Sequence, residues 1–183
     1  IVGPYQDSYS PNGIIGEKDA CGVGFVANVE GIESNWILKQ SLKGLNCMEH
    51  RGGCGGDSDS GDGAGILCSI PWGYLEEKIN LKNTQEFNRG LGMVFMPNKK
   101  EKIEICKSIC DEEAEKLKVN KTSWRTVPVN NEILGPLAKA NAPFICQWIL
   151  YIDKKDHKDV ERLLFQLRKR IEKKIRETFK NDV

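Results

Sequence analysis

The sequence carries no large excess of charge of either sign. Its 27 lysine and arginine residues and 26 aspartate and glutamate residues leave a formal net charge of +1 over 183 residues. The chain therefore has no strong overall field, and its charge does not predict binding to nucleic acid, a membrane surface or a polyanionic substrate. The hydrophobic share of 39% and the charged share of 29% are typical of a globular protein.

Long apolar segments and targeting signals are also missing. The apolar run FICQWILYI, at residues 144–152, is far shorter than the roughly 20 residues that a membrane-spanning helix needs. Residues 1–20 have neither the basic start nor the apolar centre of a secretory signal. We therefore expect no membrane partner and a location in the cytoplasm or the plastid stroma.

The cysteines do not have the spacing of a zinc site. There are seven of them, an odd number, and no two close pairs occur in the chain. Cys106 and Cys110 lie one helical turn apart, as metal ligands can, but no second pair accompanies them. We expect both to pack as small apolar side chains, and we expect no metal site in this segment.

The glycine-rich stretch RGGCGGDSDSGDGAG, at residues 51–65, does not match a known ion or phosphate loop. Asp57 and Asp59 occupy the first and third positions of a calcium loop, but Asp62 stands where glycine is required and Cys68 where a glutamate is needed. No Gly-Lys-Ser/Thr follows the glycines, which excludes a phosphate-binding loop. The string GVGFVA, at residues 22–27, resembles a dinucleotide fingerprint but lacks the preceding strand and the following helix.

The spacing of apolar residues predicts a mixed order of helices and strands in one domain. Helices are predicted at residues 34–50, 71–79, 102–118 and 159–179. Strands are predicted at residues 21–29, 65–70, 90–97, 123–129 and 143–152. The basic run from Arg168 to Lys174 is interleaved with glutamates and is expected to form a solvated helix face.

Several segments together resemble one family. They are DACGVGFVANV (19–29), LKGLNCMEHRGGCGGDSDSGDGAGIL (42–67), SIPW (69–72), WRTVPVN (124–130) and LGPLAKANAP (134–143). They resemble the glutaminase domains of glutamate synthases, which are class II glutamine amidotransferases, and the long glycine-aspartate stretch is similar to the ferredoxin-dependent type. The resemblance extends from about Asp19 to the end of the chain.

The resemblance implies an α+β protein with the four-layer αββα fold of N-terminal nucleophile hydrolases, present here as an incomplete N-terminal portion. It implies that Cys21 is the nucleophile and that residues 1–20 are a leader removed before it, leaving residues 21–183 as part of the glutaminase domain. Arg51 and Gly52 match the family's substrate-binding positions for L-glutamine. Cys54 is then not the nucleophile.

The same resemblance implies machinery that this segment does not contain. The family's oxyanion hole lies in a HNGEINT-like string that does not occur here and is expected beyond Val183. No cofactor is expected in this segment; FMN and a 3Fe-4S cluster are implied for the full-length enzyme, which adds ammonia to 2-oxoglutarate with electrons from ferredoxin. We therefore expect an N-terminal fragment that is inactive by itself.

Two alternatives remain open at the level of sequence. The chain could belong to another class II amidotransferase that delivers ammonia to a different acceptor. It could also be a non-catalytic binding or regulatory module on the same scaffold, which would retain the bond between Ala20 and Cys21.

Overall fold

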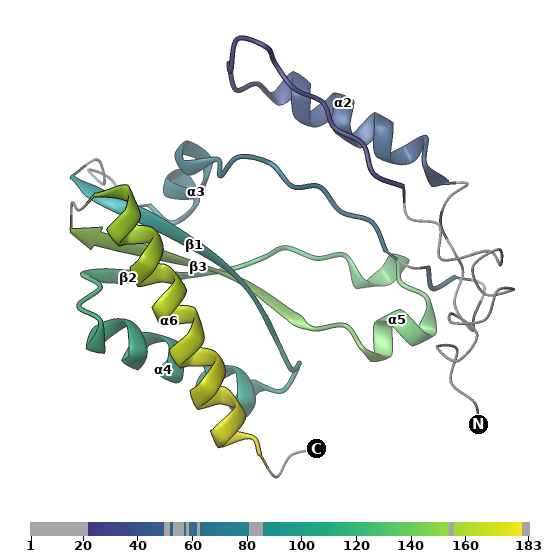
Figure 1. The fold of residues 1–183 in the computed structure, drawn as a ribbon. Coiled ribbons are helices and arrows are strands. Elements are labelled where there is room, and N and C mark those ends of the chain that lie inside the picture. Colours follow the sequence, from purple (N-terminus) through teal and green to yellow (C-terminus); the bar gives the residue numbers. More distant parts are fainter. Residues whose placement is uncertain are drawn as a thin grey trace, which may run out of the picture. The chain divides into compact units, whose positions relative to one another are not determined.

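The computed structural model describes residues 22–49, 52, 57, 59–61, 63–80, 86–153 and 156–180. These residues form two compact units, one from Ile1–Cys68 with Ile133–Ala140 and one from Ser69–Glu132 with Asn141–Val183. In chain order (Figure 1) the elements are α2 (Asn35–Asn46), α3 (Trp72–Lys78), β1 (Phe87–Met96), α4 (Lys100–Lys116), β2 (Lys121–Thr126), η3 (Asn131–Ile133), α5 (Pro136–Ala140), β3 (Phe144–Asp153) and α6 (His157–Thr178). No helix in the described ranges is both long and apolar enough to cross a membrane.

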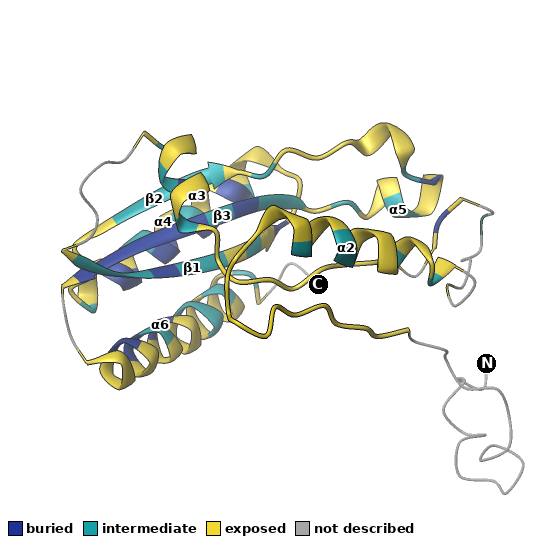
Figure 2. Ribbon diagram, turned by 90° about the horizontal axis from the view of Figure 1, so that it is seen from above, coloured by how far each residue is buried: buried dark blue, intermediate teal, exposed yellow. Residues whose placement is uncertain are grey.

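The larger unit is built on a three-stranded antiparallel sheet in the order β1-β3-β2. The central strand β3 pairs with β1 over its full length, from Phe87 opposite Asp153 to Met96 opposite Phe144. Every residue from 148 to 152 is buried, and β3 is the dark strand in the middle of the sheet in Figure 2. A strand covered on both faces favours such a continuous apolar run over strict alternation.

Helices α4 and α6 cover one face of the sheet (Figure 1). Alternate side chains of β3 pack in core clusters with residues of these helices. The buried hydrophobic residues on these helices and on that face of β3 are Ile103, Cys106, Ile109, Cys110, Ala114, Val160, Leu163, Leu167, Cys146, Trp148, Leu150 and Ile152. The helix positions repeat every three or four residues, as the sequence pattern predicts. The helices predicted at residues 102–118 and 159–179 and the strand predicted at residues 143–152 are confirmed as α4, α6 and β3.

Helix α3 packs on the opposite face of the same sheet. Leu75 is 1% exposed and forms a cluster with Ile149 and Tyr151 of β3. Pro71 immediately precedes the first helical residue, Trp72, which confirms the predicted start of this helix.

Asp111 links α4 to the sheet by accepting hydrogen bonds from three donor groups. Its carboxylate accepts from the Thr122 hydroxyl at 2.9 Å and from the indole N–H groups of Trp124 and Trp148 at 3.0 and 3.1 Å. The two indole rings stack with centroids 5.3 Å apart. The carboxylate therefore satisfies two indole donors that would otherwise lose water on packing.

Glu113 joins α4 to α6. Its side chain is 7% exposed and accepts hydrogen bonds from Lys116 at 2.6 Å and from Arg170 at 2.7 Å. The hydrogen bond from Lys116, with a smaller contribution from that of Arg170, holds the pKa of Glu113 below its usual range. Sequence patterning does not predict this buried acid, because its partner Arg170 lies on another helix.

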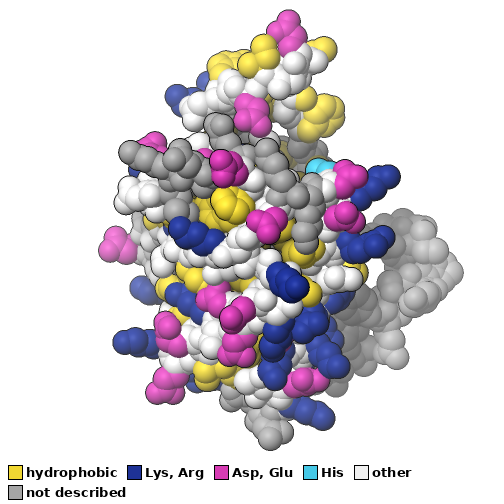
Figure 3. All heavy atoms as spheres, turned by 90° about the vertical axis from the view of Figure 1, so that its left-hand side faces the viewer, with side chains coloured by type: hydrophobic (Ala, Val, Ile, Leu, Met, Phe, Trp, Pro, Cys, Tyr) yellow, Lys and Arg dark blue, Asp and Glu magenta, His cyan; other side chains and the backbone are white. Residues whose placement is uncertain are grey.

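The basic run on α6 is a solvated face, as expected. Arg168, Lys169 and Arg176 are more than half exposed, and each forms an ion pair with Glu172 at 3.0–3.6 Å. On the face of the molecule shown in Figure 3, lysine and arginine side chains likewise lie among aspartates and glutamates. Such exposed pairs contribute little to stability, so this face does not hold the unit together.

The smaller unit contains α2 and α5. The Ser34 hydroxyl accepts a hydrogen bond from Ile37 N at 3.4 Å and caps α2, which lies within the helix predicted at residues 34–50. The predicted apolar stripe is less well covered than expected: no residue of α2 is buried, and Leu38 and Leu42 are 38% and 47% exposed.

Two predicted strands are wrong. Residues 22–28 and 63–70 have no regular structure, and Val23, Phe25 and Leu67 are 92%, 94% and 99% exposed. A strand requires a hydrogen-bonded neighbour, and the described residues provide none for either segment. Alternation of apolar and polar residues indicates that a segment could bury one face in a sheet, but it does not provide a neighbouring strand to pair with.

Strand β2 ends earlier than predicted. The sequence indicated a strand over residues 123–129, whereas β2 spans Lys121–Thr126. Val127 N still donates to Ile145 O at 3.0 Å, but Pro128 has no N–H to continue the ladder.

Two glycines on β1 provide a matched test of helix packing. A Cβ at Gly90 would lie 2.8 Å from Leu164 Cδ2, whereas a Cβ at Gly92 would meet nothing closer than 3.8 Å. We expect Gly90→Ala to lower the free energy of unfolding by about 1–3 kcal/mol, because the Leu164 side chain must leave its packed position. Gly92→Ala is expected to change it by less than about 0.5 kcal/mol. Equal effects of the two variants in chemical denaturation would contradict the described packing of α6 on β1.

Candidate functional site

The predicted site residues fall at the edge of what the structure describes. Cys21 and Arg51 lie outside the described residues. Gly52 is described: its N–H donates to Glu49 O at 3.0 Å, and a Cβ at this position would lie 3.3 Å from the same oxygen. A side chain at Gly52 would therefore press against the Glu49 backbone, so there is little room for one at this position.

Asp57 organises the glycine-rich stretch that follows. Its Oδ1 accepts from Asp59 N at 3.2 Å and from Ser60 N at 2.5 Å, which closes a local turn. Its Oδ2 accepts from the Ser60 hydroxyl and, across 80 positions of sequence, from Leu137 N, both at 2.9 Å. Asp57 therefore caps a turn within this stretch.

Ser60 makes the second connection to the segment at residues 135–138. It is 7% exposed, and its hydroxyl oxygen accepts from Ala138 N at 3.1 Å. Gly135 lies against the same place: a Cβ there would be 2.5 Å from Ser60 Oγ and 2.6 Å from Asp59 C. We call Asp57, Ser60 and Gly135 the loop anchor. It fixes the glycine-rich stretch to the start of α5.

The Asp57 carboxylate is stabilised as an anion by this arrangement. The hydrogen bond from Leu137 N, assisted by those from Ser60 and Asp59, holds the pKa of Asp57 below its usual range. Both carboxylate oxygens are thus engaged by groups of the chain itself. In the parts of the chain that the structure describes, no group of three or more His, Cys, Asp or Glu side chains is arranged to hold a metal ion.

Cys106 and Cys110 behave as the apolar side chains that the sequence predicts. Both are buried, at 6% and 3% exposure. Burial raises the pKa of Cys106, and burial with the nearby Asp111 and Cys106 raises the pKa of Cys110 to about 12. A thiol that remains protonated at neutral pH is a poor nucleophile, so neither Cys106 nor Cys110 is suited to that role.

The model of the class II glutamine amidotransferase family matches residues 21–183. The chain therefore belongs to the class II glutamine amidotransferases.

Within this class, its relatives are ferredoxin-dependent glutamate synthases. The chain is 40% identical over 166 residues to ferredoxin-dependent glutamate synthase 1, chloroplastic/mitochondrial, of Arabidopsis thaliana, a match that covers 88% of this chain and 10% of the relative. It is 40% identical over 174 residues to the chloroplastic enzyme of Oryza sativa subsp. japonica and 41% identical over 170 residues to ferredoxin-dependent glutamate synthase 2 of Synechocystis sp.; these matches cover 93% and 91% of this chain and 11% of each relative. The chain is thus homologous to their glutamine amidotransferase domain, and it spans about a tenth of their length.

Sequence reasoning did not find the loop anchor. Aspartate and serine are residue types that indicate local turns. The distant partner of Asp57 is Leu137, 80 positions away, and that of Ser60 is Ala138, 78 positions away. The signal that could have found Gly135 is its place in LGPLAKANAP, one of the segments that carry the resemblance.

If the loop anchor is packed as described, adding one methyl group at Gly135 should disturb it strongly. We expect Gly135→Ala to push the glycine-rich stretch away and to speed hydrogen exchange at the Leu137 and Ala138 amides by about tenfold or more. Gly44→Ala is the control, because a Cβ at Gly44 meets nothing within 4 Å and alanine favours the helix. The loop anchor is contradicted if exchange at both amides is the same in Gly135→Ala as in Gly44→Ala.

Proposed function

We propose that this chain carries the glutamine-hydrolysing part of a glutamate synthase. The observation that carries the proposal is the family match, which begins at residue 21, the cysteine that the sequence motif marks as nucleophile. Identity of about 40% to ferredoxin-dependent glutamate synthases supports the same assignment. Because the chain spans about a tenth of these relatives, the synthase reaction belongs to the proposal as well.

Cys21 is the proposed nucleophile, and residues 1–20 are a leader that is removed before it. A thiol with an ordinary pKa of about 8.5 needs a base at neutral pH. A free α-amino group titrates near ~7.7–8.0 and can accept that proton. While Ala20 is attached, the same nitrogen is an amide and cannot act as the base.

The reaction then runs in two halves. The Cys21 thiol transfers its proton to its own α-amino group while sulfur attacks the side-chain carbonyl carbon of glutamine. The ammonium group returns the proton to the leaving nitrogen, so that ammonia departs and a γ-glutamyl thioester remains. Water, deprotonated by the α-amino group, attacks this carbonyl, and glutamate leaves with the thiol restored.

Arg51 is proposed to hold the α-carboxylate of glutamine. A guanidinium offers two parallel donors that match a carboxylate, which fixes the orientation of the substrate. The close contact of the Gly52 N–H with Glu49 O, at the position that follows Arg51 in the sequence, is compatible with this role.

The complete domain is proposed to have the four-layer αββα fold. The larger unit supplies a helix layer, α4 and α6, on a sheet, which is compatible with one half of such an arrangement. The oxyanion-stabilising donors of the proposed reaction are expected outside residues 1–183.

The ammonia is proposed to pass to a synthase region of the longer protein, where it is added to 2-oxoglutarate with electrons from ferredoxin. FMN and a 3Fe-4S cluster are assigned to that region. The buried cysteines do not fit such a cluster: Cys106, Cys110 and Cys146 are packed among apolar side chains of two core clusters. No step of the glutaminase half involves either group. The chloroplastic names of several relatives support a plastid or cyanobacterial-type cytoplasmic location.

Replacing the nucleophile tests the proposal. In the protein purified as the cell makes it, we expect Cys21→Ala to lower glutamine hydrolysis by on the order of 10³-fold or more, because no other thiol has an adjacent terminal amine. Cys47→Ser is the matched control, since Cys47 is exposed and precedes Arg51 in the same region; its activity is expected to stay within about twofold.

Chemical labelling checks the same assignment independently. The glutamine analogue 6-diazo-5-oxo-L-norleucine is expected to modify Cys21, as mapped by mass spectrometry of the digested protein. A stoichiometric adduct on Cys47 or Cys54, with Cys21 unmodified, is incompatible with the proposed mechanism.

A further inference from the structure

The two edges of the sheet in the larger unit differ in how well they are protected. Strand β2 forms one edge: it has only six residues, carries Lys121 and Arg125, and is followed by Pro128, all of which discourage a further strand from pairing. Strand β1 forms the other edge with ten residues and contains neither lysine nor proline. Its single charged side chain, Arg89, is already paired with Glu76 at 2.8 Å. Since no described strand pairs with the outer side of β1, this edge is the one that can accept a neighbour.

The ladder between β2 and β3 shows which backbone groups of β1 face outward. Val127 N donates to Ile145 O at 3.0 Å, so the odd-numbered residues of β3 direct their backbone groups toward the β2 side. Because this direction alternates along a strand, the even-numbered residues of β3 bond to β1, where they lie opposite even-numbered residues. The backbone groups of Leu91, Met93 and Phe95 therefore point to the free edge.

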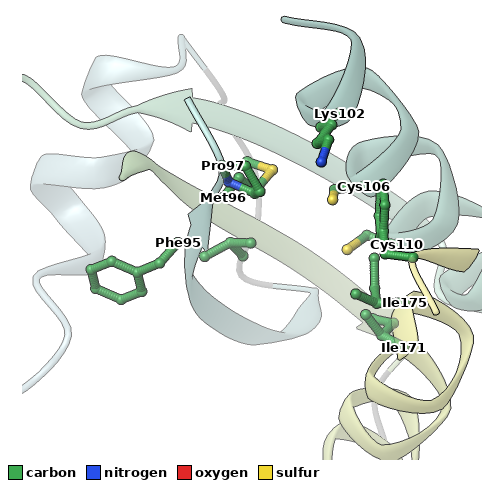
Figure 4. A pocket seen from close by; sticks show the side chains of 10 residues that line it. Phe95, Met96, Pro97, Lys102, Cys106, Cys110, Ile171 and Ile175 are labelled. Carbon is green, nitrogen blue, oxygen red and sulfur yellow. The ribbon is translucent and has the colours of Figure 1, made fainter. Parts of the chain in front are cut away.

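Exposed apolar side chains lie along the same edge. Met93 and Phe95 are 48% and 64% exposed, whereas Leu91, on the same face of β1, packs against the cluster formed by α3 and β3. In Figure 4 the Phe95 ring points away from α4 and α6, while its neighbour Met96 packs with residues of α4. A strand paired with β1 would place its own side chains beside Met93 and Phe95 as cross-strand neighbours.

The order of the elements indicates where such a strand comes from. Strands β1 and β2 both run antiparallel to β3, and the helices α4 and α6 lie on one face of the sheet (Figure 1). A connection from one strand through a helix to a parallel strand is right-handed in about 98% of cases. The connection from β1 through α4 moves toward β2. Because β3 runs in the opposite direction, a right-handed connection from β3 through α6 moves toward β1, and a following strand falls on the outer edge of β1.

Helix α6 ends where this connection requires. Ile175 and Phe179, near the end of the helix, pack against the cluster that contains Met96, the last residue of β1. A strand that starts here after a short loop runs antiparallel to β1, along its whole length. The relatives, of whose length this chain spans about a tenth, provide further chain for such a strand.

We propose that the free edge of β1 binds the strand that follows α6 in the longer protein. This strand runs antiparallel to β1 and completes a four-stranded βαββαβ unit in which it is the neighbour of β1. It presents apolar side chains next to Met93 and Phe95, because those positions are otherwise left in water. The edge of β1 is then a joint between this segment and the rest of the protein. The inference rests on the longer protein of the proposed function, but not on its glutaminase chemistry.

Hydrogen exchange in the full-length natural protein tests whether the edge is paired. Exchange is read at single amides by mass spectrometry with electron-transfer fragmentation. We expect the Leu91 and Met93 amides to exchange within about tenfold of the Gly90 and Gly92 amides, which bond to β3. Exchange at Leu91 and Met93 that is about a hundredfold faster or more would show a free edge and overturn the proposal.

Photo-crosslinking in the same protein identifies the occupant. The photoreactive residue p-benzoyl-L-phenylalanine replaces Phe95 at the edge or, as the matched control, Phe165, which is 57% exposed on α6. From position 95 we expect adducts within about 20 residues after Val183, the length of a loop and a strand, and from position 165 we expect none there. Adducts from position 95 to a second copy, to another protein or to any other segment contradict the proposal. Neither measurement uses glutamine hydrolysis, so a failure here is distinct from a failure of the proposed function.

Discussion

The larger unit depends on one constraint: the central strand β3 must be covered on both faces. Its alternate side chains face α4 and α6 on one side, while Ile149 and Tyr151 face Leu75 of α3 on the other. Two interactions then fix α4 in place, the Asp111 carboxylate on the stacked indoles and Glu113 on Arg170. Both carboxylates are engaged by donors as they leave water, which makes the polar contacts compatible with a close-packed core.

The helices and the central strand could be predicted from sequence because their information is local. The apolar positions of α4 and α6 repeat with the helical period, and Ser34 and Pro71 mark the starts of α2 and α3. Residues 22–28 and 63–70 have the pattern of strands, yet a strand also needs a neighbour with free backbone groups. That condition depends on segments distant in sequence, so the pattern alone gave the wrong structure there.

The candidate site shows the same division between local and distant information. The motif around Cys21 and Arg51 indicates the chemistry, and Asp57 is of a residue type that closes turns. Sequence does not indicate that Asp57 and Ser60 bind the backbone of Leu137 and Ala138, or that Gly135 lies too close to accept a side chain. These contacts join the two halves of the smaller unit, and they explain why LGPLAKANAP accompanies the glycine-rich stretch.

The account rests on the α-amino group of Cys21 being available as a base. The most direct measurement is the N-terminal residue of the active protein, by Edman degradation or top-down mass spectrometry of material isolated from its natural source. The account predicts that glutamine-hydrolysing protein begins at Cys21. Fully active protein in which Ala20 remains joined to Cys21 would contradict it.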